Sequence, residues 1–439
     1  MDRKETFCIL PFVGMNVHIN GGLTPCCYQD RGKQVTHRFE DYDQWRTHGL
    51  RDLKRDLLTG VKNPQCQRCW DEESAGSISY RKQYNKHYGD HPSWNINVDE
   101  PGWEDLVYDF RMLHLEFDSL CNLRCIMCHP TVSTSLETEY KLNAEQYQPF
   151  TGVINFEKVK WTETQQFESL LSALSNVDTL MVTGGEPLTN PTFIRLLKSF
   201  PNLEELNISV TTNATVVRDE VYDLLARAKT SSITVSLEGI GAHNDYLRHG
   251  SDWATVDANI QRLSQLPNYR WVKIGIATVL QYTSWQSLPP LIDYCVERGY
   301  DLRINPLHFP RYLTVDAMTD AERQRLIADL RKKFKGLVIS RREPRGKQIT
   351  YAIETLLKSQ PDSQSRDKFF SYVEMLDSIR GTRFHDVFDL DTKRKKCRKS
   401  ASPKSPSSST SKDPTPESTS GQIQSDSEST ECGGQNTQW

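Results

Sequence analysis

Between Met112 and Leu307, six short apolar runs alternate with amphipathic stretches, and this alternation constrains the fold more than any other feature of the chain. The runs have the length and composition of β-strands, whereas the stretches between them repeat apolar residues at helical spacing. A helix after each strand requires a parallel sheet with right-handed crossovers. The predicted strands are LHLEF (113–117), TLMVT (179–183), LNISVTT (206–212), SITVSL (232–237), VKIGIATV (272–279) and LRINPL (302–307).

A sheet of this kind, closed or partly closed, is a barrel with its chemistry at the carboxyl ends of the strands. The sequence therefore predicts an α/β fold built on a partial (β/α)6, TIM-like barrel. The composition changes on both sides of it, and a Ser/Thr/Pro-rich end with few large apolar residues is expected to be disordered. The expected parts are a cysteine-rich unit (1–85), a connector (86–110), the barrel (111–310), a helical region (311–390) and a disordered tail (391–439).

Composition and charge limit the location and the partners that the sequence predicts. The formal net charge of −3 gives no basic field, so the sequence does not suggest nucleic acid as a partner. No apolar run approaches the ~18 residues of a membrane span, and the first residues lack the features of a signal peptide. We therefore expect a cytoplasmic protein without a membrane partner. Because thiols stay reduced there, the 11 cysteines indicate metal or redox chemistry rather than disulfides.

Three cysteines directly follow the first predicted barrel strand, in the segment CNLRCIMC (121–128). Three thiolates bound to a cubane leave one iron without a protein ligand, open to a small chelating molecule. A structural zinc site would need a fourth ligand, for which His129 is the nearby candidate. The place at a strand end favours the iron–sulfur interpretation. The predicted ligands are Cys121, Cys125 and Cys128.

The spacing C-x3-C-x2-C after a first strand, followed by GGEP (184–187) after the next, resembles the radical S-adenosylmethionine (SAM) superfamily. The resemblance implies a 4Fe-4S cluster whose open iron binds SAM, and reductive cleavage of SAM to a 5′-deoxyadenosyl radical. It also implies a SAM pocket at the ends of the later strands. In isolation, GGEP would be a turn, Asn213 a turn cap and Arg248 a surface cation. The implied pocket residues are Gly184, Gly185, Glu186, Pro187, Thr212, Asn213, Ser236 and Arg248.

A second group of cysteines precedes the barrel. An early cysteine, a G-x4-C hairpin and a later C-x2-C resemble the SPASM/twitch auxiliary-cluster domains of radical SAM maturases, where the domain follows the barrel. The segment FFSYVEMLDSIRG (369–381) adds to this likeness. The resemblance implies a second 4Fe-4S cluster, whereas C-x2-C alone also fits a zinc ribbon. The implied ligands are Cys8, Cys26, Cys66 and Cys69, with Cys27 as an alternative; Cys295 is expected in the core, and Cys397 and Cys432 receive no role.

The resemblance implies an enzyme, a radical SAM oxidoreductase that abstracts hydrogen from a peptide or protein side chain as maturases do. Its electron donor would be a protein such as flavodoxin or ferredoxin. Two alternatives stay open: a radical SAM enzyme that acts on a small sugar or nucleoside precursor, and a non-catalytic iron–sulfur or zinc protein that senses redox state. The SAM pocket argues against the sensor, because a sensor needs no such pocket.

Overall fold

The structure is a computed structural model that describes residues 5–29, 38–74, 78–103, 110–156, 159–268, 274–337 and 344–389. All of these except Asp389 belong to a compact unit, Met1–Phe388, and the second unit is Asp389–Trp439. The tail expected to be disordered, with Cys397 and Cys432, lies outside the described residues. None of the described helices combines the length and the apolar character that crossing a membrane requires.

A mostly parallel sheet forms the centre of the compact unit, with strand order β10-β9-β7-β6-β5-β3-β1-β2. Its last six strands in the sequence lie side by side in chain order and all run parallel, so the predicted partial (β/α)6 barrel is confirmed. These strands are β3 (Met112–Glu116), β5 (Thr179–Thr183), β6 (Asn207–Thr212), β7 (Thr230–Ser236), β9 (Ile274–Leu280) and β10 (Asp301–Pro306).

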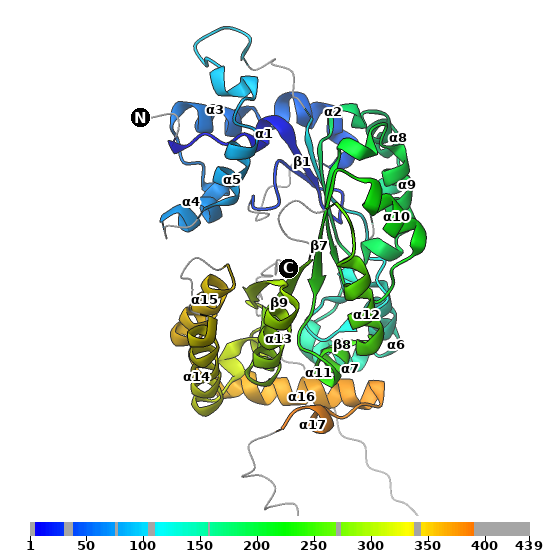
Figure 1. Ribbon diagram of the computed structural model, residues 1–439, viewed down its shortest axis with the longest axis vertical. Coiled ribbons are helices and arrows are strands. Elements are labelled where there is room, and N and C mark those ends of the chain that lie inside the picture. Colours follow the sequence, from blue (N-terminus) through cyan, green and yellow to red (C-terminus); the bar gives the residue numbers. More distant parts are fainter. Residues whose placement is uncertain are drawn as a thin grey trace, which may run out of the picture. The chain divides into compact units, whose positions relative to one another are not determined.

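Helices between the strands cover one face of this sheet, on the right in Figure 1. Side-chain oxygens of Thr164, Asn190 and Asp252 accept hydrogen bonds from the first turns of three of these helices, which fixes where each begins. The covering helices include α8 (Gln165–Ser172), α9 (Pro191–Ser199), α10 (Asp219–Arg227), α12 (Trp253–Leu263) and α13 (Ser284–Arg298).

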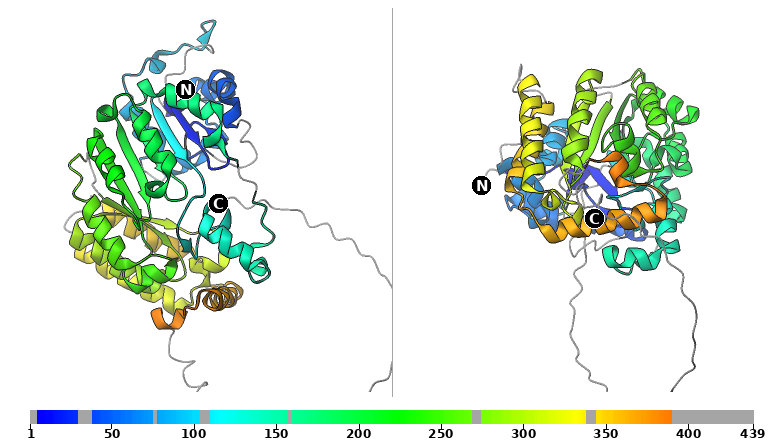
Figure 2. Two further views of the ribbon diagram at one scale, coloured as in Figure 1. Left: turned by 90° about the vertical axis from the view of Figure 1, so that its right-hand side faces the viewer. Right: turned by 90° about the horizontal axis from the view of Figure 1, so that it is seen from below.

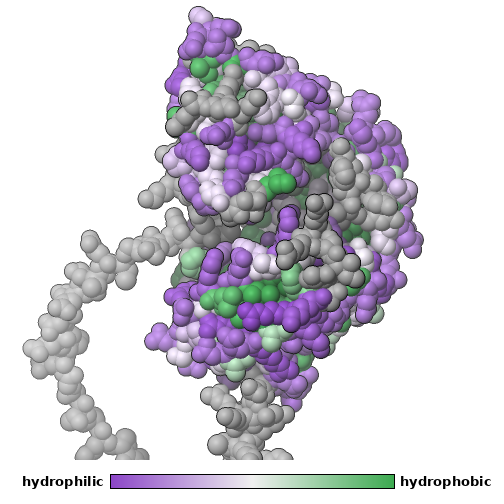
Figure 3. All heavy atoms as spheres, turned by 60° about the vertical axis from the view of Figure 1, so that its left-hand side comes forward, coloured by the Kyte–Doolittle hydropathy of each residue, from purple (hydrophilic) through white to green (hydrophobic). Residues whose placement is uncertain are grey.

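The two faces of the sheet differ in composition. Residues that face the covering helices are apolar and buried, such as Val182 in β5, Val210 in β6 and Val235 in β7. The alternate residues are mostly polar or small and are partly exposed. This second face is called the inner face below. Figure 3 brings its side forward, where the mostly hydrophilic surface is hollowed at the level of the sheet.

The amino-terminal segment extends the same sheet, which the sequence pattern does not predict. Strand β1 (Gly14–Val17) lies parallel to β3, and β2 (Leu23–Thr24) pairs antiparallel with β1. The short helices that accompany them in the described residues are α1 (Leu10–Val13), α2 (Tyr42–Gln44), α3 (Arg51–Thr59), α4 (Gln67–Ser74) and α5 (Tyr80–His87). Beside α5, the Tyr88 hydroxyl donates a 2.8 Å hydrogen bond to Asp178, directly before β5.

The carboxyl-terminal part of the compact unit is helical. It comprises α14 (Asp320–Leu337), α15 (Pro344–Lys358), α16 (Ser363–Arg380) and α17 (Phe384–Val387). Helix α15 lies along β10, where Gln348 accepts a hydrogen bond from the Ile304 amide and so covers part of the sheet edge. Helix α16 runs across the end of the barrel where the strands terminate (Figures 1 and 2).

Candidate active site

The three cysteines of CNLRCIMC lie in the loop between β3 and α6 (Thr134–Leu142), at the carboxyl end of the first barrel strand. Within this loop, the short strand β4 (Arg124–Cys125) pairs with β8 (Arg248–His249), so that Cys125 lies opposite Arg248. The Ile126 amide donates a further hydrogen bond to Leu247. The cysteine loop is therefore fastened to the segment that follows β7.

Of the three cysteines in this loop, Cys125 is buried, and Cys121 and Cys128 are partly exposed. Burial raises the pKa of Cys121, raises that of Cys125 to about 11 and raises that of Cys128 to about 12. The neighbouring Cys125 and Cys121 thiols contribute to the raised pKa of Cys128. A metal ligand must be a thiolate, so iron has to displace protons from these groups, and iron loading is favoured as the pH rises.

Arg248 places a positive charge against the cysteine loop. Its Nη1 lies 3.7 Å from Cys125 Sγ, and its Nη2 donates a 2.7 Å hydrogen bond to Glu238. Burial opposes the charge, but Cys125 and Glu238 outweigh it and raise the pKa of the guanidinium. Its buried Nε has no hydrogen-bond partner among the described residues. The open Nε donor fits an anionic group beside the cysteine loop, and three thiols form the donor set of a site-differentiated cluster.

Glu238 completes this charge pair, and the sequence prediction missed it. Its carboxylate is fully buried and also accepts hydrogen bonds from the Val279 amide and the Thr278 hydroxyl, at 2.9 and 3.3 Å. Burial raises the pKa of Glu238, whereas Arg248 lowers it. Its position two residues after the end of β7 was a signal that could have found it, because barrel chemistry lies at strand ends.

Gly184 and Gly185 allow the loop after β5 to approach the cysteine loop. Both have positive φ, and a Cβ on Gly185 would lie 2.4 Å from the Leu120 carbonyl oxygen. The Glu186 amide donates a 2.7 Å hydrogen bond to that same oxygen. The sequence predicts that backbone approaches a ligand at these glycines; in the structure, Gly185 lies against the Leu120 carbonyl of the cysteine loop and Gly184 against the Glu116 backbone of β3.

Replacing Gly185 by Ala is expected to displace the cysteine loop, because backbone atoms cannot yield to the added methyl group. We expect the free energy of unfolding to fall by about 2 to 3 kcal/mol and iron binding to weaken, as measured by urea unfolding and iron content. Gly152→Ala is the matched control, since Gly152 also has positive φ but its Cβ would meet no atom within 4 Å. Equal losses in the two variants would show that conformational strain alone matters.

Glu186 ties the loop after β5 to the loop after β6. Its buried carboxylate accepts 2.6 Å hydrogen bonds from the Thr212 hydroxyl and the Asn213 amide. The Asn213 side chain in turn donates to Asn122, at 3.0 Å, and lies 4.0 Å from Cys121 Sγ. The loops after β3, β5 and β6 therefore form one hydrogen-bonded assembly.

The remaining predicted pocket residues flank this assembly. Pro187 begins a short 3-10 helix, Pro187–Thr189, directly after Glu186. Ser236 ends β7 on the inner face, opposite Ala277 of β9, and Arg248 follows on β8. The structure thus places the predicted pocket residues at the carboxyl ends of neighbouring strands, beside the cysteine loop.

Helix α16 supports the cysteine loop from the carboxyl-terminal region. The Tyr372 hydroxyl donates a 3.2 Å hydrogen bond to the Ile126 carbonyl, and Arg380 forms a buried ion pair with Glu139 of α6. Glu139 also pairs with Arg124, inside the cysteine loop. The segment 369–381, noted above for its likeness to other radical SAM proteins, therefore contacts the predicted cluster loop directly.

Replacing Arg380 by Met is expected to lower the free energy of unfolding by about 3 kcal/mol, because it leaves the buried Glu139 carboxylate with the partly exposed Arg124 as its cation and the Tyr147 hydroxyl as its other partner. Urea unfolding measures the loss, and adding Glu139→Gln should restore part of it. Arg227→Met removes an exposed pair with Glu204 and is the control, with an expected loss below about 1 kcal/mol. A similar loss in both variants would contradict a structural role for the Arg380 pair.

Four amino-terminal cysteines lie near one another although they are far apart in the sequence. Burial and the neighbouring Cys66 and Cys69 thiols raise the pKa of Cys8, and burial, Cys27, Cys8 and Cys66 raise that of Cys26. Burial, followed by Cys69, raises the pKa of Cys66 to about 12. These mutual effects place the thiols of Cys8, Cys26, Cys66 and Cys69 in one neighbourhood.

Cys27 has a different environment from Cys26. Burial raises the pKa of its thiol, whereas a hydrogen bond with Tyr80 and the charge of Arg68 lower it. Tyr80 itself donates to Met181 Sδ on the inner face of β5, at 3.2 Å. Cys27 therefore lies toward the inner face of the barrel, and its thiol is also the neighbouring group that raises the pKa of Cys26 most after burial.

A buried polar network joins the amino-terminal hairpin to the end of β3. The His18 ring lies 3.2 Å from the Glu116 carboxylate and 2.9 Å from the Thr24 hydroxyl, which donates to the Cys26 carbonyl. Glu116 lies on the strand that leads into the cluster loop. The network thus links the hairpin that carries Cys26 to the strand that leads into the cysteine loop.

Neither group is arranged around a single ion. Among the residues that the structure describes, no set of three or more His, Cys, Asp or Glu side chains is positioned to hold one metal ion. In a cubane the requirement differs, because each thiolate binds its own iron.

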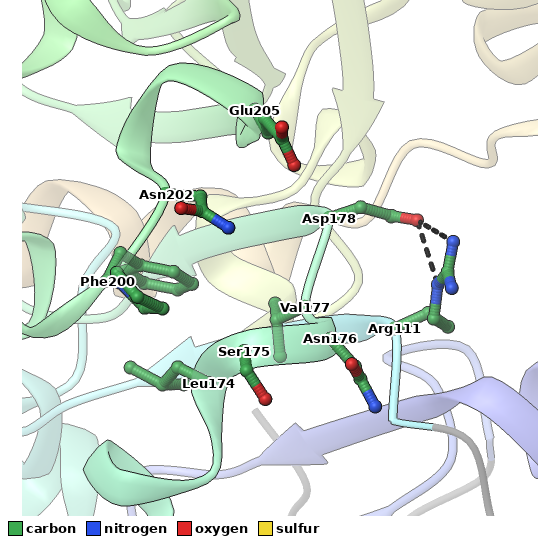
Figure 4. Close-up of a pocket in the computed structure, with 10 residues that line it drawn as sticks. Arg111, Leu174, Ser175, Asn176, Val177, Asp178, Phe200, Asn202 and Glu205 are labelled. Atoms are coloured by element: carbon green, nitrogen blue, oxygen red, sulfur yellow. Dashed lines mark hydrogen bonds and ion pairs between the residues drawn. The ribbon is translucent and has the colours of Figure 1, made fainter.

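A cavity of about 160 Å³ lies at the opposite edge of the sheet, where the strands begin (Figure 4). Arg111, directly before β3, pairs with Asp178, directly before β5, at 3.0 Å. The cavity is also lined by Asn202 and Glu205, which precede β6. Residues at this end of a barrel serve stability, so we do not place the chemistry there.

Comparison with known proteins identifies the central part of the chain. Residues 116–287 match the profile of the Radical SAM superfamily. The chain therefore contains a radical SAM domain, as the cysteine spacing and GGEP predicted.

Two curated relatives illustrate the range of related enzymes. Pre-heme d1 synthase of Dinoroseobacter shibae is 27% identical over 183 residues, which cover 41% of this chain and 39% of that protein. GTP 3',8-cyclase of Synechocystis sp. is 24% identical over 229 residues, which cover 51% of this chain and 62% of that protein. The chain thus spans less than two thirds of the length of either relative.

Two solved structures also resemble the chain. One is anSMEcpe with bound AdoMet, at 15% identity and a TM-score of 0.37, covering 52% of this chain and 61% of that one. The other is Streptococcus suis SuiB bound to S-adenosylmethionine, at 15% identity and a TM-score of 0.34, covering 65% of this chain and 59% of that one.

Proposed function

We propose that the chain is a radical SAM oxidoreductase of the maturase kind, which holds one 4Fe-4S cluster at Cys121, Cys125 and Cys128. The observation that carries the proposal is the buried Arg248, which faces these thiols with an unfilled Nε donor. When bound, the cluster supplies the electron that cleaves SAM to methionine and a 5′-deoxyadenosyl radical. The chain's own part is to hold three thiolates, compensate charge and exclude water.

Each residue beside the cysteine loop has its own proposed role in binding SAM. Gly184 to Pro187 present backbone to the SAM amino group, and the Glu186 carboxylate keeps that backbone against the loop after β6. Arg248 faces the SAM carboxylate while Glu238 holds its guanidinium in place. Thr212, Asn213 and Ser236 complete the pocket at the ends of β6 and β7. In this proposal, SAM binding depends on loops that the barrel positions rigidly.

The amino-terminal cysteines are proposed to hold a second 4Fe-4S cluster, with Cys8, Cys26, Cys66 and Cys69 as ligands. Their mutual effects on pKa support the set of four, and Cys27, which also raises the pKa of Cys26, is the alternative ligand. This cluster would take up the electron left on the substrate after hydrogen abstraction. A small iron–sulfur or flavin protein, such as ferredoxin or flavodoxin, would supply the first electron in the cytoplasm.

The proposed substrate is a peptide or protein side chain, on the likeness of the amino-terminal cysteine pattern to maturase domains. A nucleotide is the second candidate, since GTP 3',8-cyclases are among the relatives in sequence. The two substrates need different surfaces, because a triphosphate requires cationic side chains or helix amino termini.

Anaerobic reconstitution followed by a SAM-cleavage assay tests this function. We expect about eight irons and eight labile sulfides per chain, and 5′-deoxyadenosine when dithionite and SAM are added. Tightly bound zinc without labile sulfide would contradict both cluster assignments. Eight irons without any SAM cleavage would leave a redox-sensing protein as the better description.

A further inference from the structure

A row of small polar side chains crosses the inner face of the barrel, just below the strand ends. Strand pairing places Thr211 of β6 beside Thr234 of β7, and Thr234 beside Gly275 of β9. Ser209 and Ser232 form the next pair toward the start of the strands. All of them are partly exposed on a face where other (β/α) barrels pack bulky branched residues.

The hydroxyl groups on this face are available to a ligand. Five of them have no hydrogen-bond partner in the part of the chain that the structure describes, although the backbone around them is fully paired in the sheet. Serine and threonine hydroxyls both donate and accept hydrogen bonds, so the surface can bind either amide or hydroxyl groups. The five are Ser209, Thr211, Ser232, Thr234 and Ser236.

A second, independent observation is that β9 carries a glycine, Gly275, beside Thr234 on the inner face. It lies inside β9 between Thr234 and Asp301, and its φ is not positive, so the backbone conformation does not require glycine. Among the described residues, a Cβ there would come within 4 Å of the Thr234 hydroxyl alone, at 3.8 Å. Because glycine weakens a strand interior, its presence where a side chain would fit indicates that the space is used by something else.

The charges around this space disfavour a phosphorylated ligand. From β3 to β9, the described inward-facing side chains include no Lys or Arg, whereas Glu116 and Asp301 lie at the two ends of the threonine row. Arg303, opposite Ala277, is the single described cation on the inner face of β10. Arg68, which lies over the Tyr28 ring, is a second cation on this side, because it and Arg303 both lower the pKa of Tyr28. The strands themselves offer a triphosphate two carboxylates and no cluster of cations.

From these observations, we infer that the space over Gly275 binds an uncharged peptide segment whose backbone amides hydrogen bond to the hydroxyls of Thr211 and Thr234. The inference rests on the proposed function and deepens it, since it selects the peptide over the nucleotide. The substrate lies below the SAM pocket, with Gly275 as the position that keeps its path open.

The test uses affinity selection with mass spectrometry on full-length reconstituted protein. The probes are a pool of capped octapeptides with randomised uncharged residues, and GTP alone. We expect the wild type to retain peptides and not GTP, and Gly275→Val to retain at least tenfold less peptide. Thr234→Val, which keeps the shape but loses the hydroxyl, should reduce retention about fivefold. Gly89→Val is the matched control, because its Cβ would also meet nothing closer than 3.6 Å, and it should retain peptides as the wild type does.

Two further measurements show whether Gly275→Val loses peptide because of lower stability or weaker SAM binding. The melting temperature of Gly275→Val should equal or exceed that of the wild type, because valine suits a strand better than glycine. SAM binding to Gly275→Val should be unchanged. Loss of SAM binding, retention of GTP, equal peptide retention by Gly275→Val, or no peptide retained by the wild type would each overturn the inference. Failure of the proposed function would appear separately, as absent SAM cleavage by the wild type under dithionite.

Discussion

Simultaneous replacement of Cys121, Cys125 and Cys128 by Ala is expected to remove about four irons per chain and all formation of 5′-deoxyadenosine. The three thiols lie in one loop, and no other described cysteine lies on that loop. The fold should survive, because the loop is also held by the β4–β8 pair and by α16. Iron analysis, circular dichroism and the SAM-cleavage assay measure the three outcomes.

Cys295→Ala is the control for this prediction. Cys295 is a fully buried thiol on α13, and it belongs to neither cysteine group. Its loss should cost stability of about 1 kcal/mol and leave the iron content unchanged. An unchanged iron content in the triple variant would contradict the assignment of the cluster loop.

Replacement of Cys66 and Cys69 by Ala is expected to separate SAM cleavage from substrate oxidation. The described contacts of Cys121 and Arg248 come from loops of the barrel and not from α4. SAM should therefore still be cleaved under dithionite. Turnover of substrate should fall by at least a hundredfold, since the substrate radical would lose its electron acceptor. Product analysis beside 5′-deoxyadenosine quantification measures the two yields, and iron analysis should show a loss of about four irons.

Cys27→Ala provides the comparison for the double variant. The thiol of Cys27 forms a hydrogen bond with Tyr80 and is not one of the four proposed ligands, so we expect full iron content in this variant. Loss of four irons in Cys27→Ala would place Cys27 in the ligand set. An unfolded Cys66/Cys69 double variant would instead indicate a structural metal, because losing such a metal removes folding energy directly.

The barrel could be predicted from the sequence because each of its strands is short, apolar and followed by a helical pattern. Four of the six predicted runs differ from the observed strands by one or two residues at an end, as for β3 (Met112–Glu116), and β5 (Thr179–Thr183) agrees fully. The remaining run, 272–279, ends one residue before β9 does, and its first two residues, Val272 and Lys273, lie outside the described residues. The cysteine loop and GGEP were predictable for a related reason. Their spacing is local, and parallel strands bring successive loops to one edge of the sheet.

Other features depend on contacts that no local pattern contains. Strand β1 (Gly14–Val17) has too few residues to show alternation, and its place beside β3 follows from tertiary pairing. Glu238 and Arg380 are charged residues whose burial depends on partners elsewhere in the chain, Arg248 and Glu139. Charged side chains are mostly exposed, so sequence alone assigns both to the surface. The role of Gly185 could not be predicted from the sequence either, because the backbone that it approaches belongs to another loop.

The pairing of β1 with β3 also has a consequence for the order of assembly. Cys8 and Cys26 flank β1 and leave the ribosome early, but β1 has no parallel neighbour until Met112–Glu116 has been synthesised. Pairing between such distant segments is slow, because a long loop must close before any contact compensates for it. We therefore expect the amino-terminal thiols to stay accessible to oxidation during synthesis. Maturation of their site would then depend on folding of the barrel, not on the arrival of iron.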